Sequence, residues 1–391
     1  MELFVTEKNG AAIQRAIDTV FAAGGGKVTL DCGTYPSGTL YLKSNVELHI
    51  PAGSVILGGS SHEDYDDFCH PEYPTTPERC RKALIIACEA ENIAITGNGE
   101  INGQGPLFYD RNVPAGSFYK RPATPRPRLI SFFGCRNVTV NGINLIDSAG
   151  WTIWMVNCQN VYVSKIHVEG DQHMMNNDGF DIDACCNVSI SDSFFKTGDD
   201  CLVLRSIRRH PDQDAICENV TVSNCILNSP CQGIRIGCPS DDIIRHCRFS
   251  NITFRGRGTA ILSNHPAFYL RKDCTGRADI SDLSFNNFDI DANSYAVYLH
   301  CTPGINIKGI KRLSFNNFRI NSRQPILISG HAGAVFSDIE LNNISGTVRE
   351  NSALVTQFVR NLKINNVDLS AETGEVHPTI TPTGNSWETA F

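Results

Sequence analysis

The sequence lacks the features that mark several large classes of protein. None of its apolar runs approaches the roughly 18 residues that a membrane-spanning helix needs, so no membrane span is expected. Basic residues are not in excess, because 34 Lys and Arg against 41 Asp and Glu give a net charge of −7. Such a chain offers no basic surface for nucleic acid, and it gains no long-range attraction toward an anionic ligand, which local Arg or Lys would have to bind.

Charged residues are also scarce, at 19% of the chain against 41% hydrophobic residues. This composition argues against disorder and is ordinary for a globular protein with a substantial core. The first eight residues carry neither the basic n-region nor the apolar h-region of a secretory signal peptide. The chain as given is therefore expected to be cytoplasmic, and secretion stays open if a signal segment has been removed.

Cysteine, by contrast, is abundant, with 16 residues. Several cysteines stand at strand-like positions, where a reduced thiol behaves as a small apolar core residue. Reduced thiols are therefore the favoured interpretation, and a disulfide network is the alternative.

A short phrase that begins with Asn and continues with alternating apolar residues recurs along the chain. Copies begin at Asn45, Asn92, Asn137, Asn160, Asn187 and Asn219. The last four copies stand 23, 27 and 32 residues apart, a range typical of stacked structural repeats. Period-two alternation predicts strands, and the return of the phrase after each turn predicts parallel stacking. The sequence thus predicts an all-β fold, a single-domain right-handed parallel β-helix over residues 1–391, with the Asn side chains stacked at coil corners.

Three segments depart from the repeat. Residues 10–22 show helical apolar spacing before three glycines at 24–26, so they are predicted to form a helix that caps the N-terminal end of the coil. Residues 64–81 and 106–127 interrupt the strand pattern, and the second segment is rich in Pro, Tyr and basic residues. Both are predicted to be loop excursions that rim a groove, and simple surface insertions are the alternative.

Three aspartates in two short segments carry most of the functional signal. Asp178 lies in Asn-Asn-Asp-Gly-Phe-Asp at 176–181, and Asp199 and Asp200 lie in Gly-Asp-Asp-Cys at 198–201. The segments stand about one coil apart. Acidic groups placed in this way suit cleavage of a glycosidic bond, in which one carboxyl group donates a proton while another activates water.

The strand pattern predicts where these side chains point. Three coils can be aligned by inward apolar pairs, which are Phe180 with Ile182, Leu202 with Leu204, and Ile234 with Ile236. This alignment predicts that Asp178, Asp200 and Gln232 occupy neighbouring rungs, about 4.8 Å apart. Gly198 permits a bend that would turn Asp199 toward the same side.

The two aspartate segments resemble glycoside hydrolase family 28, the polygalacturonase-like enzymes, which carry Asn-x-Asp-Gly-x-Asp followed by Gly-Asp-Asp-Cys. The resemblance extends to three segments within residues 9–46. It implies that Asp199 is the general acid, that Asp178 and Asp200 hold and activate water, and that the anomeric configuration is inverted. No cofactor and no metal ion is expected.

Two departures from the family pattern concern substrate binding. Gln232 replaces the family's His, and it can hydrogen-bond but cannot titrate. The family's Arg-Ile-Lys, which binds a uronate carboxylate, corresponds to residues 260–262 of this chain, where both cationic residues are missing. A neutral sugar at the cleaved position is therefore an alternative. Arg235 on the groove face and Arg257 beside Gln232 are the predicted replacements, because guanidinium groups bind carboxylates in a bidentate way. The predicted substrate-binding residues are Asn176, Gln232, Arg235, Arg257, Trp151 and His265, with Trp151 either stacking on a sugar or covering the coil.

The expected function is that of an inverting glycoside hydrolase, exo-acting on short galacturonate- or rhamnogalacturonan-type oligosaccharides or related plant glycosides. An oligosaccharide is the expected partner, and the oligomeric state is left open. One alternative is a calcium-dependent polyuronate lyase or epimerase with Arg205 or Arg235 as base and the aspartates as ligands. Another is a carbohydrate-binding β-helix without catalysis. The Gly-Asp-Asp-Cys segment favours hydrolysis, and retention of all three aspartates argues against binding alone.

Overall fold

The computed structural model describes residues 1–70, 72, 80–122, 124, 126–237, 242–265, 277–350, 352–371 and 379–380, with only the backbone given for 259–265 and 379–380. They fall into two compact units, Met1–Asp199 and Asp200–Phe391. The prediction that the whole chain is one domain stays a prediction.

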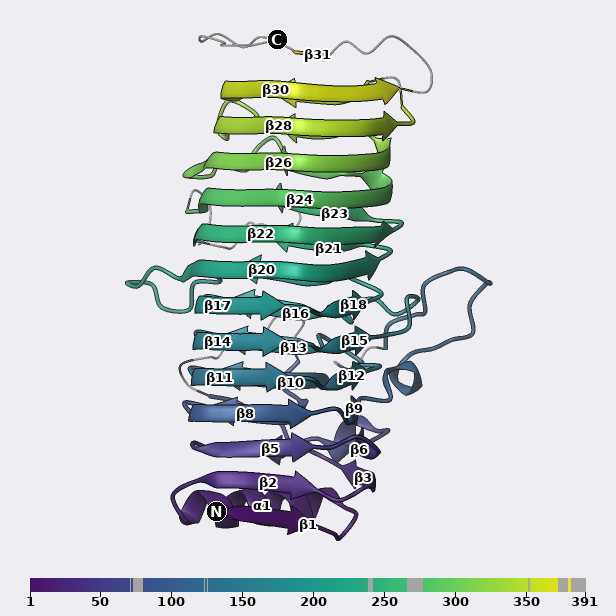
Figure 1. Ribbon diagram of the computed structural model, residues 1–391, viewed down its shortest axis with the longest axis vertical. Helices are drawn as coiled ribbons and strands as arrows, with labels where there is room; N and C mark the ends of the chain where they lie inside the picture. Colours follow the sequence, from purple (N-terminus) through teal and green to yellow (C-terminus); the bar gives the residue numbers. More distant parts are fainter. Residues whose placement is uncertain are drawn as a thin grey trace. The chain divides into compact units, whose positions relative to one another are not determined.

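The first unit is a coil of short parallel strands (Figure 1). One stack consists of β1 (Glu2–Val5), β2 (Gly26–Leu30), β5 (Val46–Ile50), β8 (Glu91–Gly97), β11 (Arg136–Asn141), β14 (Gln159–Ser164) and β17 (Cys186–Ser191). A second consists of β3 (Gly33–Ser37), β6 (Ser54–Gly58), β9 (Glu100–Asn102), β12 (Asn144–Ile146), β15 (His167–Glu169) and β18 (Phe194–Lys196). The third, which positions the candidate site, consists of β4 (Leu40–Tyr41), β7 (Ala83–Cys88), β10 (Arg128–Phe133), β13 (Ile153–Val156) and β16 (Phe180–Asp183).

The second unit continues the same pattern with longer strands. One stack consists of β20 (Ile216–Ser229), β22 (Ile243–Gly256), β24 (Asp279–Tyr295), β26 (Gly309–Gln324), β28 (Phe336–Val348) and β30 (Val359–Ala371). The other consists of β19 (Leu202–Arg205), β21 (Gln232–Ile236), β23 (Thr259–His265), β25 (Val297–Cys301), β27 (Ile326–Ser329), β29 (Leu354–Gln357) and β31 (Thr379–Ile380). Every strand pair is parallel.

Ladders of asparagine side chains turn the coil corners, as the repeat predicted. In the first unit, each Asn Nδ2 donates to the Oδ1 of the Asn one coil earlier, and the four distances from Asn92 to Asn187 run from 2.8 to 3.1 Å. Their backbones have φ between 55° and 61°, a left-handed conformation that Asn tolerates better than most residues. The recurrent Asn is therefore structural.

The inside of each coil is filled by stacked apolar side chains. In the second unit Phe285 stacks between Phe249 and Phe315, with ring centroids 4.8 and 4.9 Å away. The described cysteines are free thiols, most of them buried. Period-two alternation thus places one face of each strand in the core.

The predicted capping helix is confirmed as α1 (Gly10–Ala22). The Asn9 side chain caps it by accepting from the Ala12 backbone N–H at 2.9 Å. Ile13 and Ile17 are fully buried, whereas Phe21 is 45% exposed beside Lys43, so the buried face is narrower than the apolar spacing predicted.

Two short 3₁₀ helices, His62–Asp64 and Gly105–Phe108, lie at the starts of the two predicted loop excursions. Among the residues that the structure describes, no helix is both long and apolar enough to cross a bilayer. The prediction of an all-β, right-handed parallel β-helix with an N-terminal helix is confirmed.

Candidate active site

Asp199 ends the first unit and is held by the loop that precedes Asp178. The backbone N–H of Asn176 donates to Oδ2 of Asp199 at 2.8 Å, and Asn176 Nδ2 lies 3.5 Å from the same oxygen. Thr197 Oγ1 donates to the Asp199 carbonyl at 2.6 Å. The carboxyl group is half-buried, and its orientation is fixed by these contacts.

Gly198 lets the backbone before Asp199 pack closely against the loop that precedes Asp178. A Cβ at this position would lie 2.2 Å from the Met174 carbonyl oxygen and 2.8 Å from that of Asp171. The Gly198 N–H donates to Asn177 Oδ1 at 2.7 Å, and Asn177 Nδ2 donates to the Asp171 carbonyl at 3.1 Å. The buried Asn177 side chain therefore ties the two aspartate segments together, and only glycine fits between them.

Two arginines from the second loop excursion hold Asn176. Arg121 Nη1 donates to Asn176 Oδ1 at 2.9 Å, and Arg126 Nη2 donates to the same oxygen at 3.2 Å. Arg126 is buried and also donates to the Met175 carbonyl at 2.7 Å and to the Tyr109 hydroxyl. Asn176, predicted to bind substrate, thus serves in the structure to position Asp199.

A second set of contacts fastens the same excursion to this loop. The Tyr119 hydroxyl donates to Asp171 Oδ2 at 2.9 Å, its ring stacks on His173 at 5.4 Å, and its backbone N–H donates to the His173 carbonyl at 2.8 Å. Burial raises the pKa of Asp171, but hydrogen bonds from the His173 backbone and ring and from Tyr119 outweigh burial, so the pKa lies below its usual value. The same hydrogen bond raises the pKa of Tyr119.

This depressed pKa gives a prediction for stability. A carboxyl group of this kind stabilises the fold above its unfolded pKa, near 3.9, and loses that contribution as pH falls through the lower folded value. Asp171→Asn is expected to lower the urea midpoint at neutral pH, and the gap to wild type is expected to close below about pH 3.9. Asp368→Asn, a change at an exposed position, is the control. A gap that is constant with pH would show that the Asp171 charge contributes nothing.

Asp178 lies two residues before β16, and its backbone carbonyl is hydrogen-bonded to the preceding coil. Its carbonyl accepts from the Thr152 N–H at 2.7 Å, and its side chain is 5% exposed. The following residues alternate as predicted, with Phe180 and Ile182 facing the core. Asp181 faces outward in register with Trp154, but it too is fully buried.

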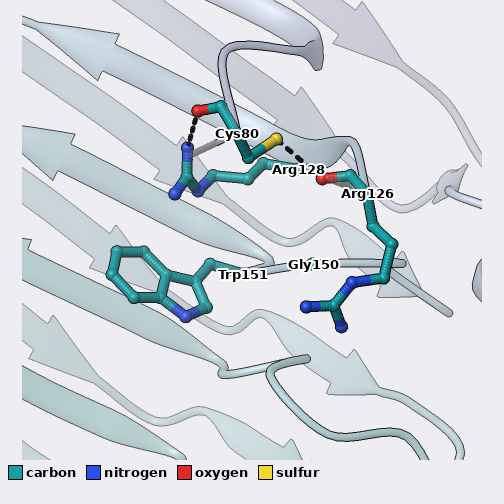
Figure 2. A pocket seen from close by; sticks show the side chains of 5 residues that line it. All are labelled: Cys80, Arg126, Arg128, Gly150 and Trp151. Atoms are coloured by element: carbon teal, nitrogen blue, oxygen red, sulfur yellow. Dashed lines mark hydrogen bonds between the residues drawn. The ribbon is translucent and has the colours of Figure 1, made fainter. Parts of the chain in front are cut away.

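Trp151 is predicted either to stack on a sugar or to cover the coil, and the structure favours the second role. It is 5% exposed and packs edge-to-face on Trp154 at 5.9 Å, within an apolar cluster on the outer face of the third stack. The Arg128 guanidinium lies 4.8 Å from the Trp151 ring (Figure 2). Trp151 thus covers the outer face of the coil, and the Arg128 guanidinium lies against its ring.

In the second unit, Asp200 is paired with Arg235. Arg235 Nη1 lies 3.3 Å from Asp200 Oδ2, and the side chains are 17% and 1% exposed. The predicted register is confirmed here, because Leu202 pairs with Ile234 and the Cys201 N–H donates to the Gln232 carbonyl at 2.9 Å. Arg235, predicted to bind substrate, therefore has a carboxylate partner within the protein.

Two further predicted substrate-binding residues are Arg257 and His265. Arg257 was expected beside Gln232, but the register partner of Gln232 is Thr259, and Ile261 pairs with Ile234. Arg257 is exposed, two residues earlier. His265 ends β23, and its side chain lies outside the described residues.

Asp178 and Asp199 belong to the first unit, and Asp200 and Gln232 belong to the second. That these residues form one cluster stays a prediction. Sequence reasoning missed Arg121 and Arg126, although the basic and Tyr-rich composition of residues 106–127 was a signal.

The chain matches known proteins across the two aspartate segments. A sequence model of the glycosyl hydrolases family 28 matches residues 71–210, which include all three aspartates. Over these residues the chain is similar to glycoside hydrolase family 28. A probable polygalacturonase from Arabidopsis thaliana is 26% identical over 56% of this chain and 52% of its own length. An endo-polygalacturonase from Pectobacterium carotovorum subsp. carotovorum is 25% identical over 80% of this chain and 84% of its own length. The chain spans about half the length of the first curated relatives that it matches.

Solved structures support the fold. A hyperthermoactive exopolygalacturonase from Thermotoga maritima has a TM-score of 0.68 and 19% identity, covering 94% of this chain and 91% of its own. The fold is shared beyond family 28, because a mannuronan C-5 epimerase module from Azotobacter vinelandii has a TM-score of 0.61 at 14% identity and covers 96% of this chain and 95% of its own. A Streptococcus pneumoniae surface adhesin has a TM-score of 0.64 at 15% identity and covers 96% and 99%. The fold alone therefore leaves hydrolase, epimerase and adhesin open, and the family match must decide.

Proposed function

We propose that this chain is an inverting glycoside hydrolase that acts from the end of short pectin-derived oligosaccharides. The observation that carries the proposal is the family 28 match, which spans Asp178, Asp199 and Asp200. Similarity to polygalacturonases from Arabidopsis thaliana, Pectobacterium carotovorum and Zea mays supports galacturonate-containing substrates.

In the proposed reaction Asp199 is the general acid. It gives its proton to the glycosidic oxygen as the bond from that oxygen to the anomeric carbon breaks. Because the Asn176 N–H donates to Oδ2 of Asp199, the acidic proton is best carried by Oδ1. Arg121 and Arg126 act indirectly, since they hold Asn176 and so keep this orientation.

Asp178 and Asp200 are the proposed bases. A water molecule held by their carboxylates attacks the anomeric carbon from the face opposite the leaving group, and its proton passes to one of them. The new bond from water to carbon forms on the opposite side, so the released sugar has the inverted configuration. This step needs the two units to bring both carboxylates to one water, which is part of the proposal.

Exo action is supported by the loop contacts. The excursion 106–127 is fastened to the loop before Asp178 through Tyr119, Arg121 and Arg126, and it would limit how far a polymer extends on that side. The relatives do not distinguish exo from endo action, because they include both an endo-polygalacturonase and an exopolygalacturonase.

A time course of product sizes tests the proposal. The full chain is incubated with polygalacturonate, trigalacturonate, rhamnogalacturonan fragments and neutral plant glycosides, and products are separated by size. Mono- or disaccharide release from the first minutes supports exo action, whereas mixed lengths from the start contradict it. An unsaturated product that absorbs in the ultraviolet and disappears with chelator would instead indicate the lyase alternative.

A further inference from the structure

The second unit contains a long strand with one open edge. Along one edge, β30 (Val359–Ala371) pairs with β28 (Figure 1). Along the other edge, no strand of the described residues pairs with it, because β31, the later strand among them, pairs with β29 in the other stack. Within that part of the chain, the backbone N–H and C=O groups that point away from β28 have no strand to pair with. Such an edge is a template for a further strand.

The apolar core is also less well covered at this edge. Ile364 and Val367 of β30 are in register with Leu341 and Ile344 of β28 and, like them, belong to the inward face. Leu341 and Ile344 are fully buried, whereas Ile364 and Val367 remain partly exposed. One further rung of apolar side chains would remove this surface from water, which is favourable.

A second copy of β30 provides such a rung. Two identical coils that meet end to end about a two-fold axis bring their last strands together in opposite directions. The strand turns a corner at residues 365–366, where both side chains continue the asparagine ladders. An axis through this corner places Ile364 opposite Val367 of the second copy, and Leu362 opposite Leu369. Apolar residues therefore face apolar residues across the axis.

The corner is what permits this alignment. In a regular strand, neighbouring residues face opposite sides, so an axis between two residues would bring inward side chains opposite outward ones. Here Asn366 has φ of 50°, in the left-handed region, and the side chains of Asn365 and Asn366 are both exposed. The alternation restarts after the corner, so the inward residues on its two sides lie equally far from the axis.

The charges on β30 agree with the same alignment. It places Lys363 opposite Asp368 of the second copy, and this pair occurs twice in the dimer. Opposite charges at directly facing positions stabilise antiparallel strands. Lys363 also donates to Glu340 at 3.0 Å, and its ammonium group has three donors.

This charge match belongs to β30 and not to the repeat. The earlier long strands carry no pair of opposite charges at the two equivalent positions, which are Glu340 and Ser345 in β28, Ser314 and Arg319 in β26, Ser284 and Asp289 in β24, Arg248 and Thr253 in β22, and Thr221 and Ile226 in β20. A single alignment thus matches both the apolar and the charged residues of β30, which favours a second copy of this chain over an unrelated strand.

We propose that the chain forms a two-fold symmetric dimer in which the β30 strands of two copies pair antiparallel. The sheet of the second unit then continues from one copy into the other. Inward apolar residues of both copies close the core, and Lys363 with Asp368 sets the register. The proposal does not depend on the proposed hydrolase function.

Analytical ultracentrifugation and hydrogen exchange of the full chain test the dimer. Twice the mass of one chain is expected at micromolar concentrations, the weak end of the range for interfaces of standard size, and the single mass on dilution. The amides of residues 359–371 are expected to exchange more slowly in the dimer than in the monomer. A chain that stays monomeric contradicts the proposal, and so does a dimer in which these amides exchange as they do in the monomer.

Charge reversal tests the register of the two strands. Asp368→Lys is expected to weaken the dimer by about 10- to 100-fold, because two attractive pairs become repulsive, and Lys363→Glu is expected to do the same. An equal mixture of the two variants is expected to associate with nearly wild-type affinity, since opposite charges then face each other again. A purely structural effect of either change would not be rescued by mixing.

Matched changes complete this test. Asp291→Lys is the same substitution at an exposed position of β24 and is expected to leave the dimer as strong as wild type. Asp368→Asn removes an attraction without adding a repulsion, and exposed pairs contribute little, so this chain is expected to remain dimeric at micromolar concentrations. If Asp368→Lys and Lys363→Glu each dimerise as strongly as Asp291→Lys, the proposed pairing of β30 is wrong.

Discussion

Replacing Asp199 by Asn is expected to lower kcat by about 10²–10⁴-fold, the usual contribution of a general acid, with little change in substrate affinity. The amide has nearly the size and shape of the carboxyl group. Its oxygen can still accept from the Asn176 N–H, which now lies 2.8 Å from Oδ2, so the loop should keep its place. What is lost is the proton for the leaving oxygen. The measurement is the initial rate of reducing-sugar release from trigalacturonate, with Kd from calorimetry.

Asp368→Asn provides the matched control for this variant. It makes the same chemical change at an exposed position of β30, and its rate is expected to equal that of wild type. An Asp199→Asn chain that keeps more than about a tenth of the wild-type rate would remove Asp199 from the role of acid.

Replacing Gly198 by Ala is expected to reduce both stability and activity. The new Cβ would lie 2.2 Å from the Met174 carbonyl oxygen and 2.8 Å from that of Asp171, and both are backbone atoms that cannot turn aside. Relief requires the loop or the Gly198 peptide to shift, at a cost of about 1–3 kcal/mol. The shift would displace Asp199, and a displacement of about 1 Å at a reacting group is enough to cost roughly 10²-fold in rate. Thermal denaturation and initial rates measure the two effects.

Gly309→Ala is the control for the added methyl group. Its Cβ would have no heavy atom nearer than 4.0 Å, and its φ is not positive, so stability and rate should be unchanged. If Gly198→Ala matches it in both measurements, the close packing around Gly198 does not position the acid.

Much of the fold could be predicted because the signals are local and repeated. Each coil repeats an Asn at a left-handed corner and an alternating strand, so a single coil suffices to predict its neighbours. The pairing of Leu202 with Ile234 could be predicted from the inward apolar pairs, because a shift of one residue would turn these side chains to the outer face. The capping helix could be predicted because its apolar spacing is also a local signal.

The surroundings of the candidate site were harder to predict, because they depend on loops. Arg121 and Asn176 are 55 residues apart, and no periodicity connects them. The sequence around Trp151 was compatible both with stacking on a sugar and with covering the coil. The apolar cluster around Trp151 in the structure favours the second role. Arg257 was misplaced because its coil was aligned on a family motif that this chain lacks, whereas in the structure Thr259 pairs with Gln232 and Ile261 with Ile234.

The most direct test of the account is proton NMR of trigalacturonate during its first turnovers by the full chain, reading which anomer is released before mutarotation. The proposed water between Asp178 and Asp200 predicts that the new reducing end first appears in the configuration opposite to that of the cleaved linkage. Release with retained configuration, or an unsaturated product without uptake of water, would contradict the inverting hydrolase.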